Sequence, residues 1–498
     1  MQLSEYCKKA HLDFDKVSLH QRRIKQLLEG SSESKVENIL PIIETCRFDN
    51  GLIIKLPNLQ NVKFHKFKMA AFTPAAGAAS RYFNIFTDFI DAAESLEVDS
   101  LVGELNAFFK EGALDWPIPS VFRRLIMQRD QLKSIDFDQL KVLVNSAVLA
   151  LKSPKLLQPC VVDDLTFLQL KQAEMASIEG IDEQYFVIQP DHEKLVRPFL
   201  KDNDKILFQD AGLSTIRFDG LANPIIENNC LSIVPAGHGA LADLFSKVEN
   251  ADSVFIKNVD NVVGNSPKVI QATNDFLNTH QLILATVKEV RRMLLQDNLE
   301  GCFRILTNLL DDLELNYPTQ SLKPQNDVKD LWDIVDFLFY ATERYTRDLA
   351  GLKSVFDRPV NTMGMVPNSG TDVGGTPCIV SINGSNKRIC LEVPHASQSD
   401  QSKWLEDPAM ATHFNPVFVC AEIPRIAEYY TSQTDEFWLL AKKTFKGERV
   451  YYHELALYEL LSHSDLTNTV FVEIPRFLFN PHKSLKDASG ISSSHWIK

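Results

Sequence analysis

A run of small residues that ends in an arginine is the first feature that could do chemistry. Residues 74–81 read PAAGAASR and follow a strand-like run at 68–73. Small side chains let backbone N–H groups approach a phosphate closely, and the helix expected next favours an anion at its N-terminus. Arg81 would add a guanidinium fork for phosphate oxygens. The predicted phosphate loop comprises Ala75, Ala76, Gly77, Ala78, Ala79 and Ser80. A tightly packed strand-to-helix turn is the alternative.

A lysine between two prolines is the second feature. Residues 153–159 read SPKLLQP. Because proline fixes the backbone φ angle, this segment is stiff, and the ammonium of Lys155 could be held against a phosphate. The pattern alone is weak, since most lysines are solvated surface residues.

Two neighbouring segments form the third feature. Residues 235–242 read PAGHGALA, and residues 256–261 read IKNVDN at the end of an apolar strand. Open α/β sheets bind ligands beyond the carboxyl ends of their strands, which is where Asp260 falls. Strand alternation places Asn258 and Asp260 on one face and Lys257 on the other. Asp260 is therefore a candidate Mg²⁺ ligand, with a turn or helix-capping carboxylate as the alternative.

The same residues also fit a rival pattern. Gly237-x-Gly239-x-x-Ala242 matches the G-x-G-x-x-G/A fingerprint of dinucleotide-binding folds, and Asp260 ends the next strand. This interpretation predicts an NAD(P)-dependent oxidoreductase that uses residues 237–260. It requires that residues 230–260 form a βαβ unit with a glycine-rich crossover.

Strand-like and helical runs alternate around these features. Strand-like runs end near residues 188, 208, 234 and 260, and helical runs are expected at 191–200 and from about residue 240. Such alternation predicts an α/β fold with a largely parallel sheet. We expect a helical N-terminal segment (1–66), a nucleotide-binding α/β core (67–266), a helical region (267–356) and a C-terminal α/β part that completes the substrate site (357–498).

Composition excludes several classes of protein. The 498 residues carry a formal net charge of −13, which argues against nucleic acid as a partner. No run approaches the roughly 18 apolar residues of a membrane span, and the first residues do not resemble a signal peptide. The eight cysteines are scattered without a CxxC pair. This usage favours reduced thiols and a cytoplasmic location.

Several motifs together resemble a bacterial family that is catalogued as a domain of unknown function. In chain order they are GAASR at 77–81, GHGAL at 237–241, FIKNVDNVV at 255–263, GMV at 364–366 and THFNP at 412–416. More remotely, PAAGxxSR, PKxLxP and the GHG–VDN pair resemble segments of the UTP-sugar-1-phosphate uridylyltransferases. Those proteins are nucleotidyltransferases with a glycosyltransferase-A-like fold.

The remote resemblance implies a mixed, mainly parallel sheet flanked by helices and a sugar-1-phosphate nucleotidyltransferase activity. A sugar-phosphate oxygen would attack the α-phosphorus of a nucleoside triphosphate and expel pyrophosphate. Arg81 and Lys155 would be the catalytic cations, and Asp260 would hold Mg²⁺. Residues 75–80 would bind the nucleotide, together with Gly237, His238 and Gly239.

The C-terminal part is expected to supply the remaining contacts. Asn415 and Glu392 are candidates for a second metal or phosphate contact, with Asn258 as a further substrate contact. Gly374 and Gly375 could let a loop close over the sugar or could form a hairpin turn. A lysine for the sugar phosphate is expected among Lys442, Lys443 and Lys446.

Some positions depart from these families. Ala79 stands where the uridylyltransferases usually carry glycine, and Tyr82 and Asn84 stand where the closer family tends to have Met and Lys. These departures motivate an alternative, a catalytically silent protein that binds a nucleotide or nucleotide sugar on the same fold.

Overall fold

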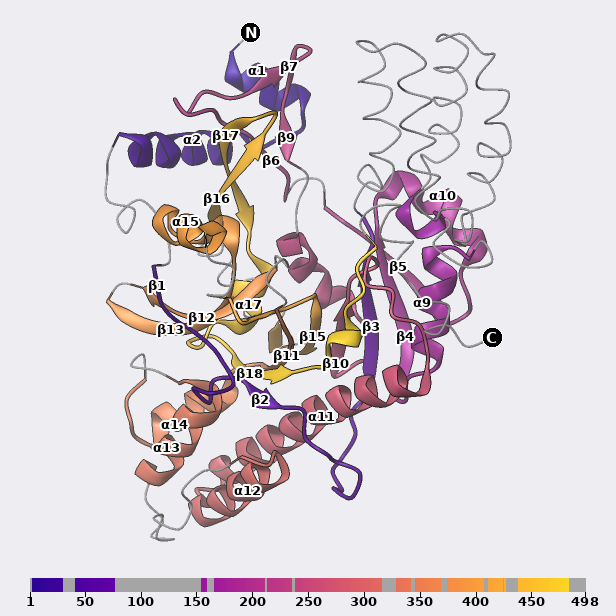
Figure 1. Cartoon of the computed structure of the whole chain (residues 1–498), viewed down its shortest axis with the longest axis vertical. Coiled ribbons are helices and arrows are strands. Elements are labelled where there is room, and N and C mark those ends of the chain that lie inside the picture. Colours follow the sequence, from indigo (N-terminus) through magenta and orange to yellow (C-terminus); the bar gives the residue numbers. More distant parts are fainter. Residues whose placement is uncertain are drawn as a thin grey trace. The chain divides into compact units, whose positions relative to one another are not determined.

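The chain is assembled from two compact units, each made of segments that are far apart in the sequence. The computed structural model describes residues 2–29, 41–76, 154–158, 165–210, 213–234, 238–315, 328–341, 345–368, 374–382, 384–406, 411–423, 425–426 and 438–482. Unit 1 contains Met1–Ala70, Gln209–Ile256 and Asn274–Arg476. Unit 2 contains Ala71–Phe208, Lys257–Thr273 and Phe477–Lys498. Figure 1 labels the elements of both.

Unit 2 is built on three neighbouring strands in the order β3-β4-β5. They are β3 (Met69–Pro74, with its last four residues in this unit), β4 (Ile181–Ile188) and β5 (Asp204–Phe208). Strands β4 and β5 are parallel. Helices α9 (Phe167–Ala176) and α10 (Glu193–Val196) lie beside them in Figure 1, and α9 contacts β4. The predicted strands at 185–188 and 205–208 are confirmed.

The helix expected at 191–200 is interrupted. It consists of a 3₁₀ turn (Pro190–His192), the single α-turn α10 and a second 3₁₀ turn (Arg197–Phe199). Pro198 lacks an N–H donor and its ring collides with the preceding turn, so a continuous helix cannot pass through it.

Unit 1 contains a mixed sheet in the order β2-β18-β11-β15-β10. Its central strand β11 (Val360–Pro367) pairs in parallel with β18 (Asn468–Glu473), which pairs in parallel with β2 (Ile54–Lys55). Strands β15 (Phe418–Glu422) and β14 (His413–Phe414) are antiparallel to β11, and β10 spans Ser253–Lys257. Helices α13 (Val328–Phe339) and α17 (Leu457–Ser462) contact β18. The predicted α/β fold, a mixed and mainly parallel sheet flanked by helices, is confirmed.

Most described residues of the region predicted to be helical, 267–356, form helices. It contains α11 (Pro267–Leu295), α12 (Leu299–Asp312), α13 and α14 (Leu349–Asp357). In unit 1 the aromatic rings of Phe276 on α11 and Phe418 on β15 pack edge to face, with their centres 4.9 Å apart. The ring of Phe255 on β10 packs against Phe418 in the same way, with the same distance between ring centres. Such edge-to-face contacts join helix and sheet in the core.

Smaller sheets complete unit 1. One has the order β1-β12-β13, with β1 (Ile42–Thr45), β12 (Gly375–Ile382) and β13 (Ser385–Glu392). The hairpin of β16 (Trp438–Phe445) and β17 (Glu448–Leu455) packs against the N-terminal helices α1 (Leu3–Lys9) and α2 (Phe14–Leu28). Two short antiparallel pairs are β6 (Thr215–Ile216) with β9 (Ile233–Val234), and β7 (Ile226–Glu227) with β8 (Cys230–Leu231). Helix α15 spans Gln398–Glu406.

No helix among the described residues is long and apolar enough to cross a membrane.

A buried ion pair joins the long helix α11 to the sheet of unit 1. Arg291 contacts Glu422 through two parallel hydrogen bonds, Nη1 to Oε1 at 2.6 Å and Nη2 to Oε2 at 2.9 Å. The second oxygen also accepts the backbone N–H of Val360 at 2.9 Å. Glu422 is 2% exposed. Removing the charge of one partner would leave the guanidinium buried and uncompensated.

We therefore expect Glu422→Gln to lower the free energy of unfolding by about 3 kcal/mol. The matched control is Glu289→Gln, which breaks an exposed Glu289–Arg292 pair on α11 and should cost about 0.5 kcal/mol or less. Urea unfolding followed by tryptophan fluorescence measures both. Equal losses in the two variants would contradict this assignment.

Candidate functional site

Lys155 and Asp260 form an ion pair within unit 2. The ammonium of Lys155 contacts Oδ1 of Asp260 and donates a hydrogen bond to the carbonyl of His482 at 3.3 Å. The two side chains are 9% and 20% exposed, so the lysine is buried while part of the carboxylate reaches solvent. The structure thus brings together two of the three charged residues predicted to share a site. Arg81 lies outside the described residues.

Local structure explains how Lys155 reaches this position. A 3₁₀ turn (Lys155–Leu157) begins directly after Pro154, and its second residue, Leu156, is fully buried. The turn is tied to the start of α9, because the N–H of Phe167 donates to the carbonyl of Gln158 at 3.1 Å. The ammonium lies 5.3 Å from the centre of the Phe167 ring, within the range of a cation–π contact.

Asp260 lies in a turn that follows β10. The strand ends at Lys257, and the N–H of Asn261 donates to the carbonyl of Asn258 at 3.2 Å. The predicted strand alternation therefore stops before Asp260. A C-terminal segment, residues 478–482, fixes this turn: His482 N–H donates to the Asp260 carbonyl at 2.8 Å, and Val262 N–H donates to the Asn480 carbonyl at 3.1 Å.

The predicted phosphate loop begins beside the same turn. The N–H of Val259 donates to the carbonyl of Pro74 at 3.3 Å. Ala75 is buried, and its N–H donates to the Val187 carbonyl at the end of β4 at 2.9 Å. The first residues of the loop are therefore fixed between β4 and the turn of Asp260. Residues 77–80 lie outside the described residues, and their role stays a prediction.

A buried charge cluster contacts the residues that follow Asp260 in the turn. Glu174 on α9 receives the ammonium of Lys171 at 2.8 Å and that of Lys257 at 3.0 Å, both on Oε2. Its other oxygen accepts the backbone N–H groups of Val263 at 2.9 Å and Gly264 at 3.2 Å. Lys171 also donates to the carbonyl of Asn261. The three charged side chains are between 0% and 3% exposed.

Burial and charge set the protonation of this cluster. Burial lowers the pKa of Lys257 to about 7, a shift that the neighbouring Glu174 carboxylate only partly offsets. Burial favours the neutral form of Glu174, but the two ammonium groups and the backbone N–H donor outweigh it and lower the pKa of that carboxyl. Sequence reasoning missed Lys171 and Glu174, because charged residues on a helix normally indicate a solvated face.

Gly239 has a packing role in unit 1. It lies in a 3₁₀ helix (His238–Lys247), and a Cβ at this position would lie 2.0 Å from the carbonyl oxygen of Leu455. Only glycine tolerates such an approach. Gly237 lies outside the described residues, so its predicted nucleotide contact stays a prediction, as does that of His238.

The prediction of a dinucleotide-binding oxidoreductase is wrong. The strand before the fingerprint, β9, is antiparallel to β6 in a separate two-stranded sheet, whereas β10 belongs to the sheet of β15. Residues 230–260 therefore do not form the parallel βαβ unit that the fingerprint requires.

The candidates from the C-terminal part all lie in unit 1. The amide of Asn415 is occupied by the backbone: it donates to the carbonyls of Gly364 and Phe418 and accepts the N–H of Val417. Gly375 begins β12 opposite Glu392, and a Cβ there would lie 2.7 Å from the sulfur of Cys390. A Cβ on Gly374 would lie 3.0 Å from the Asn415 carbonyl. These contacts indicate structural roles for both glycines and for Asn415, and their predicted substrate and metal contacts stay predictions.

Glu392 and the three lysine candidates have distinct surroundings. Burial, with the nearby Glu459 carboxylate, raises the pKa of Glu392 to about 7. Lys443 pairs with Glu454 at 3.3 Å. Lys442 is buried, and Lys446 pairs with Glu227 at the surface.

Comparison with known proteins gave one family and a set of solved structures. The family model described as "Domain of unknown function (DUF4301)" matches residues 203–489. Comparison with the curated proteins gave no match.

The similar solved structures include proteins from Trypanosoma brucei and Leishmania major. One is the UDP-glucose phosphorylase of Trypanosoma brucei, with 12% identity and a TM-score of 0.43 over 95% of this chain and 77% of that chain. Another is a mutant UDP-glucose pyrophosphorylase of Leishmania major in complex with UDP-glucose, with 11% identity and a TM-score of 0.45 over 97% and 77%. The open and closed structures of the same Leishmania major enzyme give 11% identity and a TM-score of 0.44 over 97% and 77%.

The buried cluster predicts a specific pH dependence of stability. The folded chain holds Lys257 with a pKa of about 7, against 10.5 for an unperturbed lysine. Between these pH values the unfolded chain binds a proton that the folded chain lacks, so the free energy of unfolding gains a contribution that rises with pH. Lys257→Met should remove this rise between pH 7 and about 9.5.

The matched control is Lys205→Met. Lys205 is a partly exposed lysine on β5 whose pKa is raised through its hydrogen bond to Glu183. It stays protonated in both states over this range, so the control should keep the wild-type slope. Urea unfolding at several pH values gives the slopes, and identical slopes for wild type and Lys257→Met would contradict the assignment.

Proposed function

We propose that this chain, which belongs to the family described as a domain of unknown function (DUF4301), is a sugar-1-phosphate nucleotidyltransferase. The family model matches more than half of the chain, so the family predicted from the motifs is confirmed. The observation that carries the proposed activity is the Lys155–Asp260 pair. It lies at the end of β10, beside the first residues of the predicted phosphate loop.

The proposed reaction moves a nucleotidyl group. A phosphate oxygen of the sugar 1-phosphate forms a bond to the α-phosphorus of a nucleoside triphosphate. The bond from the α-phosphorus to the bridging oxygen breaks, and pyrophosphate leaves with that electron pair. Such a step needs no protein nucleophile. It needs both substrates held in line and the charge of the phosphates neutralised.

The described residues of unit 2 suit these tasks. Lys155 is held by its turn and by Phe167, so its ammonium is positioned before a substrate arrives, which lowers the cost of ordering it. Backbone N–H groups of residues 75–80 and the guanidinium of Arg81 would bind the triphosphate. In this role Lys155 exchanges part of its contact with Asp260 for a phosphate oxygen.

The turn that carries Asp260 fits a magnesium ion. Its carboxylate and the amide oxygen of Asn258 are the hard oxygen donors that Mg²⁺ prefers, and the Asp260 side chain is 20% exposed. Mg²⁺ commonly binds through one or two carboxylates and completes its shell with water and substrate phosphates. When bound, it would neutralise charge on the triphosphate.

Two substitutions test the assignment. Asp260→Asn removes the negative charge and Lys155→Met removes the cation, while both keep most of the side-chain volume. Each should lower pyrophosphate release by about 100-fold or more, measured with a panel of nucleoside triphosphates and sugar 1-phosphates in the presence of Mg²⁺. Asp202→Asn and Lys205→Met are matched controls in unit 2, because Lys205 lies on β5, the edge strand of the order β3-β4-β5, and Asp202 lies shortly before that strand in the sequence. They should keep wild-type activity.

The outcomes separate the proposal from its alternative. Pyrophosphate release that survives in Asp260→Asn would overturn the assigned site. Thermal stabilisation of the wild type by Mg²⁺-nucleotides without turnover across the panel would overturn the activity and support a silent nucleotide-binding protein. A lack of both stabilisation and turnover would remove both functions.

A further inference from the structure

We propose that Glu392, His395 and Glu459 of unit 1 form a binding site for one divalent transition-metal cation of the Zn²⁺ class. This inference does not depend on the proposed nucleotidyl transfer, because its residues belong to unit 1 and its test measures metal binding alone.

Three elements bring the ligands together. Glu392 ends β13, His395 ends the 3₁₀ turn that follows (Val393–His395), and Glu459 lies in the first turn of α17. One ligand atom from each residue lies within 4.8 Å of the other two. The donors around a Zn²⁺ ion lie about 2.0–2.2 Å from the metal, so a set this compact needs only a small contraction to enclose one.

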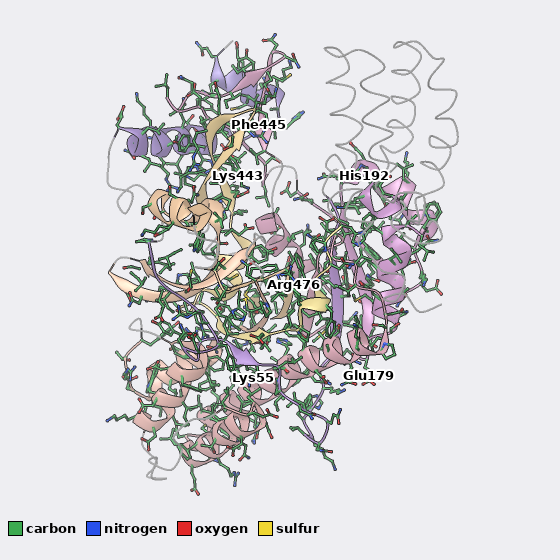
Figure 2. All side chains as sticks on the ribbon, viewed as in Figure 1. Lys55, Glu179, His192, Lys443, Phe445 and Arg476 are labelled. Atoms are coloured by element: carbon green, nitrogen blue, oxygen red, sulfur yellow. The ribbon has the colours of Figure 1, made fainter. Side chains whose placement is uncertain are left out.

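The histidine is oriented as metal-binding histidines are. Its Nε2 lies 3.1 Å from Oε1 of Glu454, and its Nδ1 lies 2.7 Å from Oε1 of Glu459. In metal sites a ligating histidine donates its other ring N–H to a carboxylate, which fixes the tautomer and the ring orientation. Glu454 supplies that carboxylate here. Nδ1 donates to Glu459 in this structure, and a metal ion bound at Nδ1 would displace that proton. Lys443, which is labelled in Figure 2, contacts Glu454 at 3.3 Å and neutralises it.

A second observation comes from Glu459 itself. Its Oε1 accepts hydrogen bonds from His395 and, at 3.0 Å, from the backbone N–H of Glu392. Its Oε2 is buried and has no hydrogen-bond partner among the described residues, and the residue is 1% exposed. A buried acceptor without a partner is costly. Because the two oxygens share one carboxylate, Oε2 lies at the cluster, where a cation would satisfy it.

Charge and access agree with this assignment. The carboxyl groups of Glu392, Glu454 and Glu459 surround the His395 ring and the Lys443 ammonium, and a divalent cation that replaces the Nδ1 proton of His395 would add positive charge among them. Glu392 and Glu454 are half-buried, and the Lys443 side chain is 43% exposed. Two of the acidic residues are therefore partly accessible from solvent.

The donor set selects the class of metal. One imidazole nitrogen and two carboxylates suit Zn²⁺ and its neighbours, whereas Mg²⁺ prefers oxygen donors and keeps its water. Three protein ligands leave one position of a tetrahedral ion for water. Bound there, the ion would link β13 to the first turn of α17, so it should raise the thermal stability of the protein.

The test is a titration of the chelator-treated full-length protein with Zn²⁺ alone, in competition with a chromophoric zinc indicator. We expect one saturable equivalent per chain and a rise in melting temperature. Glu459→Gln and Glu392→Gln should each weaken this binding by about 100-fold or more and abolish the rise. Glu454→Gln should weaken it about 10–100-fold, because it removes the partner of the histidine.

Glu448→Gln is the matched control, an exposed glutamate at the start of β17, and it should bind Zn²⁺ as the wild type does. If Glu459→Gln fails to give the wild-type far-UV circular dichroism, Glu392→Gln at the half-buried rim decides the question. The proposal is overturned if the wild type has no saturable equivalent. It is also overturned if the folded Gln variants bind as tightly as the wild type, which would assign the metal to others among the twelve histidines.

Discussion

The proposed catalytic turn depends on one buried carboxylate, that of Glu174. Two lysine ammonium groups meet one of its oxygens, and two backbone N–H groups of residues 263–264 meet the other. Charged groups this deeply buried are stable only when each is paired and hydrogen-bonded, so the cluster tolerates little displacement. Residues 263–264 directly follow the turn that carries Asp260. Backbone hydrogen bonds from the C-terminal residues 478–482 also hold this turn. The position of Asp260 is therefore fixed by the Glu174 ion pairs and by the backbone hydrogen bonds of residues 478–482.

Lys155 is fixed by different means, and the difference is chemically useful. Its backbone is set by Pro154 and by the contact with α9, while its ammonium faces a partly exposed carboxylate and one carbonyl. Lys171 and Lys257 both pair with the buried carboxylate of Glu174. Lys155 is the one of these three whose partner reaches solvent, and that is what a phosphate-binding cation requires.

Sequence patterns predicted the features that depend on local order along the chain. Alternating apolar runs gave the strands β4, β5 and β10 and the helical region after residue 267, and the motifs singled out Lys155 and Asp260. Sequence patterns failed where the role of a residue depends on partners that are far away in the sequence. Gly239 matched a nucleotide-binding fingerprint, yet glycine is required there because any side chain would collide with the carbonyl of Leu455. Lys171 and Glu174 were not singled out, because charged residues on a helix normally indicate a solvated face, and no local pattern connects them with Lys257. The two compact units also join segments that no linear pattern connects.

The most direct test of the central claim follows the α-phosphorus itself. Wild-type protein is incubated with Mg²⁺, a sugar 1-phosphate and a nucleoside triphosphate labelled with ³²P at the α position, and the products are separated. We predict that the label appears in a nucleotide sugar, and that label placed instead at the γ position appears in pyrophosphate. If the α label stays in the triphosphate for every base and sugar tried, while the protein binds the Mg²⁺-nucleotide, the claim of nucleotidyl transfer is contradicted.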